Sequence, residues 1–112
     1  MSKLEERLAT LEYYMELLLK QLDHKRFPWD AFIIRVRLSR REVEFIYHTC
    51  EKLSKEMEKQ KAEGFVTFTP LLIQFRQALP SGLPWEETIY ALRSQGLYTS
   101  LMDEFHKLIK KK

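Results

Sequence analysis

Histidine and cysteine are the residues in this chain best suited to metal binding or nucleophilic chemistry, and there are few of them. The three histidines, His24, His48 and His106, are far apart, and none has a second ligand type at the spacing of a metal site. Cys50 follows His48 by two positions, so on a helix their side chains point in different directions. Cys50 also falls on an apolar face, which is typical of a core thiol. We therefore expect no metal site.

The adjacent carboxylates Glu86 and Glu87 resemble an acid–base pair. Neighbouring helical positions diverge, however, and acidic residues just after Pro84 suit the positive end of a helix dipole. The few glycines are widely separated, so the sequence contains no phosphate-binding loop. We expect no catalytic residues, no cofactor and no enzymatic activity.

One charge cluster has no acidic residue inside it, and it consists of Arg35, Arg37, Arg40 and Arg41. A short helix followed by a helix capped at Ser39 would resemble a helix-turn-helix, in which this cluster could contact a phosphate backbone. The other interpretation is a solvated elbow whose arginines pair with Asp30, Glu42 and Glu44. The following helix has an outer face of mixed charge, which favours the elbow. The net charge of +3 is concentrated in this patch and in the terminal lysines, Lys110, Lys111 and Lys112.

The elements that would position these residues begin with a leucine heptad repeat over residues 2–22. Spacings of four and three place six apolar residues on one helical stripe: Leu4, Leu8, Leu11, Met15, Leu18 and Leu22. They fit the a and d positions of a coiled coil. Ser2, with Glu5 three residues later, supplies a capping box where the helix can begin. Because one helix cannot bury its own stripe, the pattern predicts a homo-oligomer.

The number of subunits is less strongly specified, since leucine at both a and d does not fix it. Tyr14 at a g position and Leu19 at an e position widen the stripe. Three helices around an axis bury more of each helix than two do, so we favour a homotrimer over a homodimer. Aspartate at positions 11 and 18 should dissociate the subunits and unfold much of each, because unpaired carboxylates are costly to bury.

The remaining sequence, residues 28–112, predicts a body of four or five further helices. Pro28 suits a first helical turn, and Ser39 with Glu42 forms a second capping box. The helix after Ser39 should end at Gly64 through a left-handed residue. Its apolar face carries Val43, Ile46, Tyr47, Cys50, Leu53 and Met57.

Three later helices complete this body. They are expected over residues 71–79 with Thr69 as cap, from about residue 84 to Gly96, and over 97–110. Residues 65–68 are strand-like but too short for a sheet. The predicted fold is all-α, a single domain over 1–112 with residues 2–22 as its oligomerisation helix.

Composition places the chain among ordinary globular proteins, with 45% hydrophobic and 31% charged residues in 112. No apolar run approaches the roughly 20 residues of a membrane span. The N-terminus lacks a basic region followed by an apolar block, so we expect no secretory signal and a cytoplasmic location. The single cysteine agrees with a reducing compartment.

Three stretches resemble the YhaI-like family of small proteins from Bacillus-type bacteria. They are residues 7–20 (RLATLEYYMELLLK), 59–68 (KQKAEGFVTF) and 87–102 (ETIYALRSQGLYTSLM). The resemblance implies an intertwined all-helical oligomer, a biochemical role that is not established, and no active residues to carry over. Where relatives have a Gly-Leu-Ser turn, this chain has Arg37-Leu38-Ser39. The arginine patch is therefore expected to be particular to this chain.

Together these patterns favour a non-enzymatic, homo-oligomeric helical scaffold or adaptor. It would act through protein–protein contacts, including one with an unidentified protein partner. The alternative is a small nucleic-acid-binding regulator that uses residues 35–41 and the C-terminal lysines. We expect no membrane association, and we favour the scaffold over nucleic-acid binding because basic residues do not extend over the helix faces.

Overall fold

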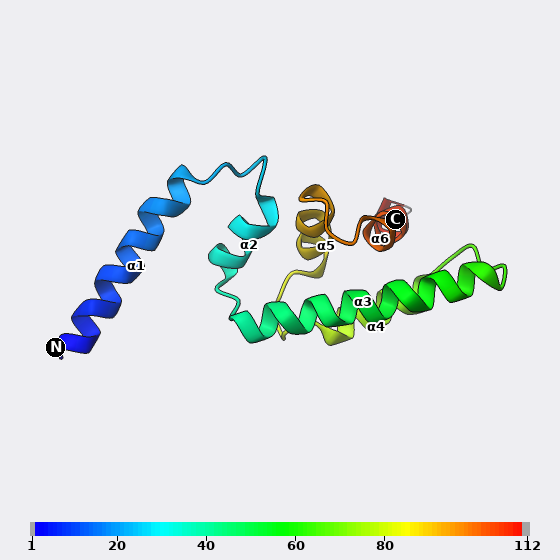
Figure 1. The fold of residues 1–112 in the computed structure, drawn as a ribbon, viewed down its shortest axis with the longest axis horizontal. Helices are drawn as coiled ribbons and strands as arrows, with labels where there is room; N and C mark the ends of the chain where they lie inside the picture. The colour runs from blue at the N-terminus through cyan, green and yellow to red at the C-terminus, as the bar shows by residue number, and fades with distance from the viewer. Residues whose placement is uncertain (1, 111–112) are drawn as a thin grey trace.

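The computed structural model describes residues 2–110, which form six α-helices and no β-strand (Figure 1). The helices are α1 (Lys3–Gln21), α2 (Pro28–Val36), α3 (Arg40–Ala62), α4 (Thr69–Ala78), α5 (Trp85–Ser94) and α6 (Thr99–Lys110). The prediction of an all-α fold is confirmed. The strand-like residues 65–68 join α3 to α4 without regular structure. In this part of the chain no helix combines the length and the apolar character needed to cross a bilayer.

The hydrophobic core is formed by the five helices α2, α3, α4, α5 and α6. Helix α5 packs on α6 and α2, while α3 packs on α4 and α6. Aromatic rings fill much of the space: Trp29 stacks on Phe32 at 5.7 Å between ring centroids, and Phe75 meets Phe105 at 5.5 Å. The predicted inner face of α3 is confirmed, with four residues fully buried: Ile46, Cys50, Leu53 and Met57.

Helix α1 contributes nothing to that core. No residue of α1 is buried, and the core cluster takes its members from α2 to α6 and the residue that precedes α4. Figure 1 shows α1 as an arm at one end of an elongated molecule of 60 × 26 × 23 Å. The described residues therefore form a helical body, α2 to α6, with its own core, and a helix α1 that this body leaves uncovered.

Both predicted helix starts carry their capping serine. Ser39 Oγ accepts a hydrogen bond from the Glu42 amide at 3.1 Å, and the Ser39 amide donates to Glu42 Oε1 at 2.8 Å, which completes a capping box. At α1, Ser2 Oγ accepts from the Glu5 amide at 3.1 Å. There Glu5 Oε1 accepts from the Ser2 hydroxyl at 3.2 Å, so the box is only half formed.

The predicted end of α3 is also confirmed, since Gly64 has φ +97°. The Gly64 amide donates to the Lys61 carbonyl at 3.0 Å and the Phe65 amide donates to the Gln60 carbonyl at 2.9 Å. This pair of bonds is a Schellman motif, which satisfies carbonyls that the last helical turn leaves free.

Two predicted boundaries were wrong. Helix α6 begins at Thr99, not at residue 97, because Tyr98 has φ +51° and so cannot belong to the helix. The Tyr98 carbonyl instead accepts the first bond of α6, from the Met102 amide at 2.9 Å. Helix α4 already includes Thr69, and its N-cap is Phe68, whose buried ring anchors the turn to the core.

Candidate oligomer interface

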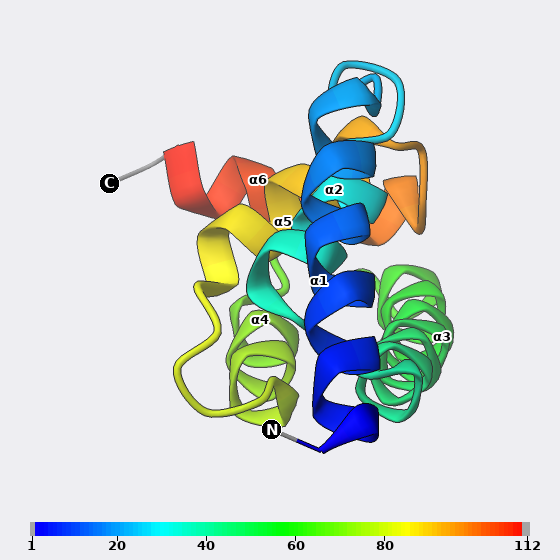
Figure 2. The ribbon, with the colours of Figure 1, turned by 90° about the vertical axis from the view of Figure 1, so that its left-hand side faces the viewer.

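The heptad stripe of α1 is open to solvent over most of its length. Four of its leucines, Leu4, Leu8, Leu11 and Leu18, are between 51% and 66% exposed. Met15 and Leu22 are half-buried. The rings of Tyr13 and Tyr14 are also exposed. Figure 2, seen from the α1 side of the molecule, shows α1 in front of the other helices along its whole length.

Local hydrogen bonds hold the turn that carries α1. Asp23 Oδ1 accepts from the amides of Lys25 and Arg26 at 3.0 and 3.2 Å. His24 Nε2 is hydrogen-bonded to the Leu19 carbonyl at 3.1 Å at the end of the helix. These side-chain hydrogen bonds are all within residues 19–26, so they hold the turn without covering the leucine stripe.

One ion pair links α1 to the body within residues 2–110: Glu12 Oε2 lies 3.6 Å from Arg37 Nη1. Both side chains are mostly exposed, at 57% and 68%. Exposed pairs of this kind contribute little to stability. The contact places the middle of α1 beside the α2–α3 elbow, with the leucine stripe still accessible.

The arginine cluster lies at that elbow, but its predicted partners were wrong. Arg35 pairs with Glu87 at 3.5 Å, and Arg37 pairs with Glu12. The three acids expected to pair with the arginines have other partners or pair with none of the four. Asp30 accepts a hydrogen bond from Gln95, and Glu42 accepts one from the Ser39 amide in the capping box. Glu44 forms no ion pair with any of the four arginines. Sequence separation explains the error, since Glu87 reaches Arg35 only through the packing of α5 on α2.

Arg40 and Arg41 are exposed and form no ion pair among the described residues. Helix α2 packs mainly against α5, whereas a helix-turn-helix packs its two helices on each other. Helix α6, which ends at Lys110, lies away from the α2–α3 elbow in Figure 1. Lys111 and Lys112 lie outside the described residues. Within residues 2–110, the arginine cluster and the end of α6 are therefore in separate parts of the molecule.

The histidines and the cysteine have different surroundings: His24 is bonded to the Leu19 carbonyl, His48 is exposed on α3 and Cys50 is in the core. His106 packs edge-on against Tyr90 at 5.3 Å between ring centroids, and burial together with the nearby Arg93 lowers its pKa. Cys50 is fully buried, and burial with the charge of Glu51 raises the pKa of its thiol to about 12. The Cys50 thiol is therefore protonated at neutral pH. Nowhere in residues 2–110 do three His, Cys, Asp or Glu side chains gather in a group that could hold a metal ion.

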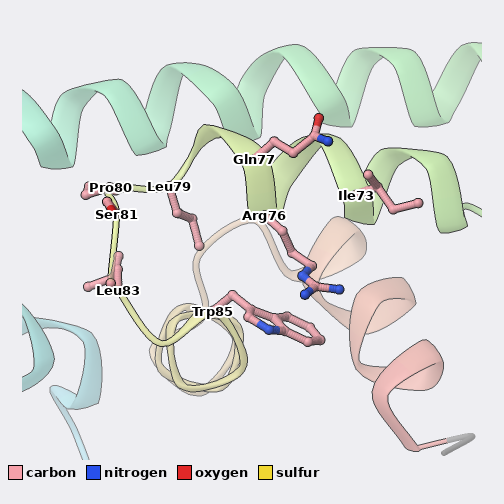
Figure 3. A pocket seen from close by; sticks show the side chains of 9 residues that line it. Ile73, Arg76, Gln77, Leu79, Pro80, Ser81, Leu83 and Trp85 are labelled. Carbon is pink, nitrogen blue, oxygen red and sulfur yellow. The ribbon is translucent and has the colours of Figure 1, made fainter.

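A hollow between α4 and the turn before α5 is a site that sequence patterns did not reveal (Figure 3). The Arg76 guanidinium lies over the Trp85 ring at 4.2 Å from its centroid, a cation–π geometry. The hollow has a volume of about 460 Å³, and none of the residues that line it is an acid, a histidine or a cysteine. It offers a cation and apolar surface without an acid–base group. Arg76 and Trp85 are nine positions apart in the sequence, and the turn that joins α4 to α5 brings them together.

The fold and the exposed leucine stripe together define a small all-helical protein with an uncovered N-terminal helix. Residues 1–110 match the family described as "Protein of unknown function (DUF1878)", and the chain belongs to this family. The matched range includes α1 as well as the helical body. The uncovered helix is thus part of the family's unit.

Proposed function

We propose that this protein is a non-enzymatic homo-oligomeric scaffold whose subunits join through α1. The observation that carries the proposal is a 19-residue helix with no buried residue and a stripe of exposed leucines. In proteins most helical stability comes from the packing of an apolar face, and exposed apolar patches mark interaction sites. Association through the stripe would supply the packing that α1 lacks.

A second copy of the chain is the occupant that the pattern fits best. Apolar residues at a and d let identical helices interlock as knobs into holes, and no polar residue interrupts the seam from Leu4 to Leu22. Tyr14 and Leu19 flank that seam, and we keep the homotrimer as the favoured state. The resemblance to YhaI-like proteins supports an intertwined arrangement. Beyond self-assembly, the scaffold would present its helical bodies to an unidentified protein partner.

Size exclusion with light scattering tests the proposal on the unmodified chain. We expect the mass of three chains, and a monomer at micromolar concentration would contradict the scaffold function. The double variant Leu11→Asp/Leu18→Asp should be monomeric, because it places charges in the seam. Helices α2 to α6 form the core without α1, so we expect the body of this monomer to stay folded. Its circular dichroism spectrum should keep the helical signal of these five helices.

Tyr13→Asp is the matched control for that variant. Tyr13 is 56% exposed on the same helix, but it occupies an f position outside the seam. It introduces an aspartate on α1, one where the double variant has two, without changing the a and d residues. The control should keep the mass of the unmodified protein, and its dissociation would mean that charge on α1, not the seam, controls association.

Nucleic-acid binding is the alternative function, favoured by the unpaired Arg40 and Arg41. An electrophoretic shift assay at low salt, on duplex and single-stranded DNA, separates the two functions. For a scaffold we expect no shift. A shift that weakens steeply with salt and is lost in Arg40→Ala/Arg41→Ala would establish the alternative, because phosphate binding releases counterions.

A further inference from the structure

We infer that α1 assembles in parallel and in register with α1 of other copies, with Arg7 of one copy paired to Glu12 of the next. This inference rests on the proposed function and adds the direction and register of the contact. It is carried by the charges that flank the leucine stripe. Those charges distinguish the two possible directions, which the leucines alone do not.

The heptad register assigns the flanking positions. With Leu8 at a and Leu11 at d, the g edge holds Arg7, Tyr14 and Gln21, and the e edge holds Glu5, Glu12 and Leu19. In a parallel coiled coil, each g residue faces the e residue five positions later on the neighbouring helix. Two such pairs lie within residues 2–22, one between positions 7 and 12 and one between positions 14 and 19. In each pair the two side chains attract one another.

The first of these pairs joins opposite charges, Arg7 with Glu12 of the neighbour. Arg7 is exposed and has no ion pair among residues 2–110 of its own chain. Glu12 is 57% exposed and bound only through its exposed contact with Arg37. Such a contact is weak, so Glu12 can also accept a second arginine.

The second pair joins two apolar side chains, Tyr14 with Leu19 of the neighbour. Tyr14 is 53% exposed and Leu19 is half-buried. Both lie directly beside the a/d stripe, so contact between them extends the apolar seam. The parallel direction thus places charge against charge near the N-terminus and apolar against apolar further along.

The antiparallel direction offers no such matches. There the e edge of one helix faces the e edge of the other, and g faces g. The e edge holds two acids and no cation, while the g edge holds one cation and no acid. No ion pair can form between the two helices across either edge, and Glu5 and Glu12 would share an edge with like charges. Since opposite charges at e and g set helix orientation, the parallel direction is favoured.

A charge-swap experiment tests the pair. Arg7→Glu and Glu12→Lys each turn the attraction into repulsion, so each should raise the dissociation constant on the order of tenfold. The double variant should recover the original value, because opposite charges meet again at every interface. A 1:1 mixture of the two single variants should recover part of it, because two of the three interfaces of a mixed trimer then join opposite charges. Glu16→Lys is the matched control, since Glu16 is exposed at a b position outside the interface. Failure of the mixture and of the double variant to recover would overturn the pairing.

Disulfide trapping tests the direction independently. Leu4→Cys should cross-link to the same residue of another copy in the parallel arrangement. In the antiparallel one, Leu4→Cys would instead cross-link with Leu22→Cys in a mixture of the two variants. Cys50 does not interfere, because it is fully buried. An oligomer that gives only the mixed cross-link would overturn the parallel inference and leave the scaffold intact, whereas a monomeric unmodified chain would overturn the scaffold itself.

Discussion

Gln95 is hydrogen-bonded to Asp30 across 65 residues of sequence and caps helix α2 from the end of α5. Gln95 Oε1 accepts from the Trp29 amide at 2.8 Å and from the Asp30 amide at 3.1 Å, and Gln95 Nε2 donates to Asp30 Oδ1 at 3.0 Å. The N-cap residue of α2 is Phe27, whose side chain cannot accept these bonds. One side chain therefore satisfies two free amides and ties α2 to α5.

Gln95→Ala should lower the free energy of unfolding by about 1–2 kcal/mol, because it leaves both amides of α2 without their acceptor. Urea unfolding followed by circular dichroism measures the change. Gln74→Ala is the matched control, since Gln74 is exposed on α4 without a side-chain hydrogen bond, and it should be near neutral. Equal stability of the two variants would show that the cap contributes nothing.

Gly64→Ala should lower the free energy of unfolding by about 1 kcal/mol, because Gly64 has φ +97° and a side chain at this backbone conformation is strained. An added Cβ would meet no atom within 4 Å, so backbone conformation alone determines the cost. The midpoint of urea unfolding measures it. Glu63→Ala is the control, since Glu63 lies one residue earlier at φ −87° and tolerates any side chain. An unchanged midpoint for Gly64→Ala would mean that the turn adapts without strain.

Arg37→Gly should have the opposite effect. Arg37 has φ +61° at the end of α2, where the Leu38 amide donates to the Ile33 carbonyl at 3.1 Å in the same type of motif. A side chain at a left-handed backbone position is strained, and glycine removes this strain. The free energy of unfolding of Arg37→Gly should therefore exceed that of Arg37→Ala by about 0.5–1 kcal/mol. The alanine variant is the reference because both changes remove the pair with Glu12. A glycine variant no more stable than the alanine variant would contradict the strain.

Cys50 and Tyr98 should make the protein less stable at alkaline pH. Their folded-state pKa values are raised from 9.0 and 10.0 to about 12, by burial first and by Glu51 second. The folded state thus keeps protons that the unfolded chain has lost. Their contribution to stability is complete below about pH 9 and declines as the pH rises toward 12.

Unfolding experiments across that range measure the loss. In Cys50→Ala, the free energy of unfolding should decline less steeply with pH than in the unmodified protein. The variant should be less stable at every pH, because the smaller side chain leaves a cavity in the core. Tyr98→Phe should flatten it as well, and it also loses the hydrogen bond from Tyr98 Oη to Glu51 Oε1. In the folded protein at about pH 8, Cys50 should not react with Ellman's reagent. Rapid labelling without unfolding would contradict its burial.

Features that depend on neighbouring residues could be predicted from the sequence. The Ser39–Glu42 box and the end of α3 at Gly64 each involve a few consecutive residues, whose chemistry decides the conformation. The inner face of α3 follows from a 3.6-residue period, so Cys50 was correctly placed in the core.

Features that depend on which elements meet could not be predicted. The Gln95 cap, the pairing of Arg35 with Glu87 and the contact of Arg76 with Trp85 each join different helices. Sequence spacing says nothing of them, because helix packing alone sets these distances. The start of α6 was also missed, because position 98 holds a tyrosine and not the glycine that would indicate a positive φ.

Helix α1 combines both cases. The sequence by itself determined that residues 2–22 form a helix with a leucine stripe, because capping and heptad spacing are local. Only the tertiary structure decided that the stripe remains uncovered. Helices α2 to α6 bury their apolar faces in a core to which α1 contributes no residue, so the leucines stay in solvent.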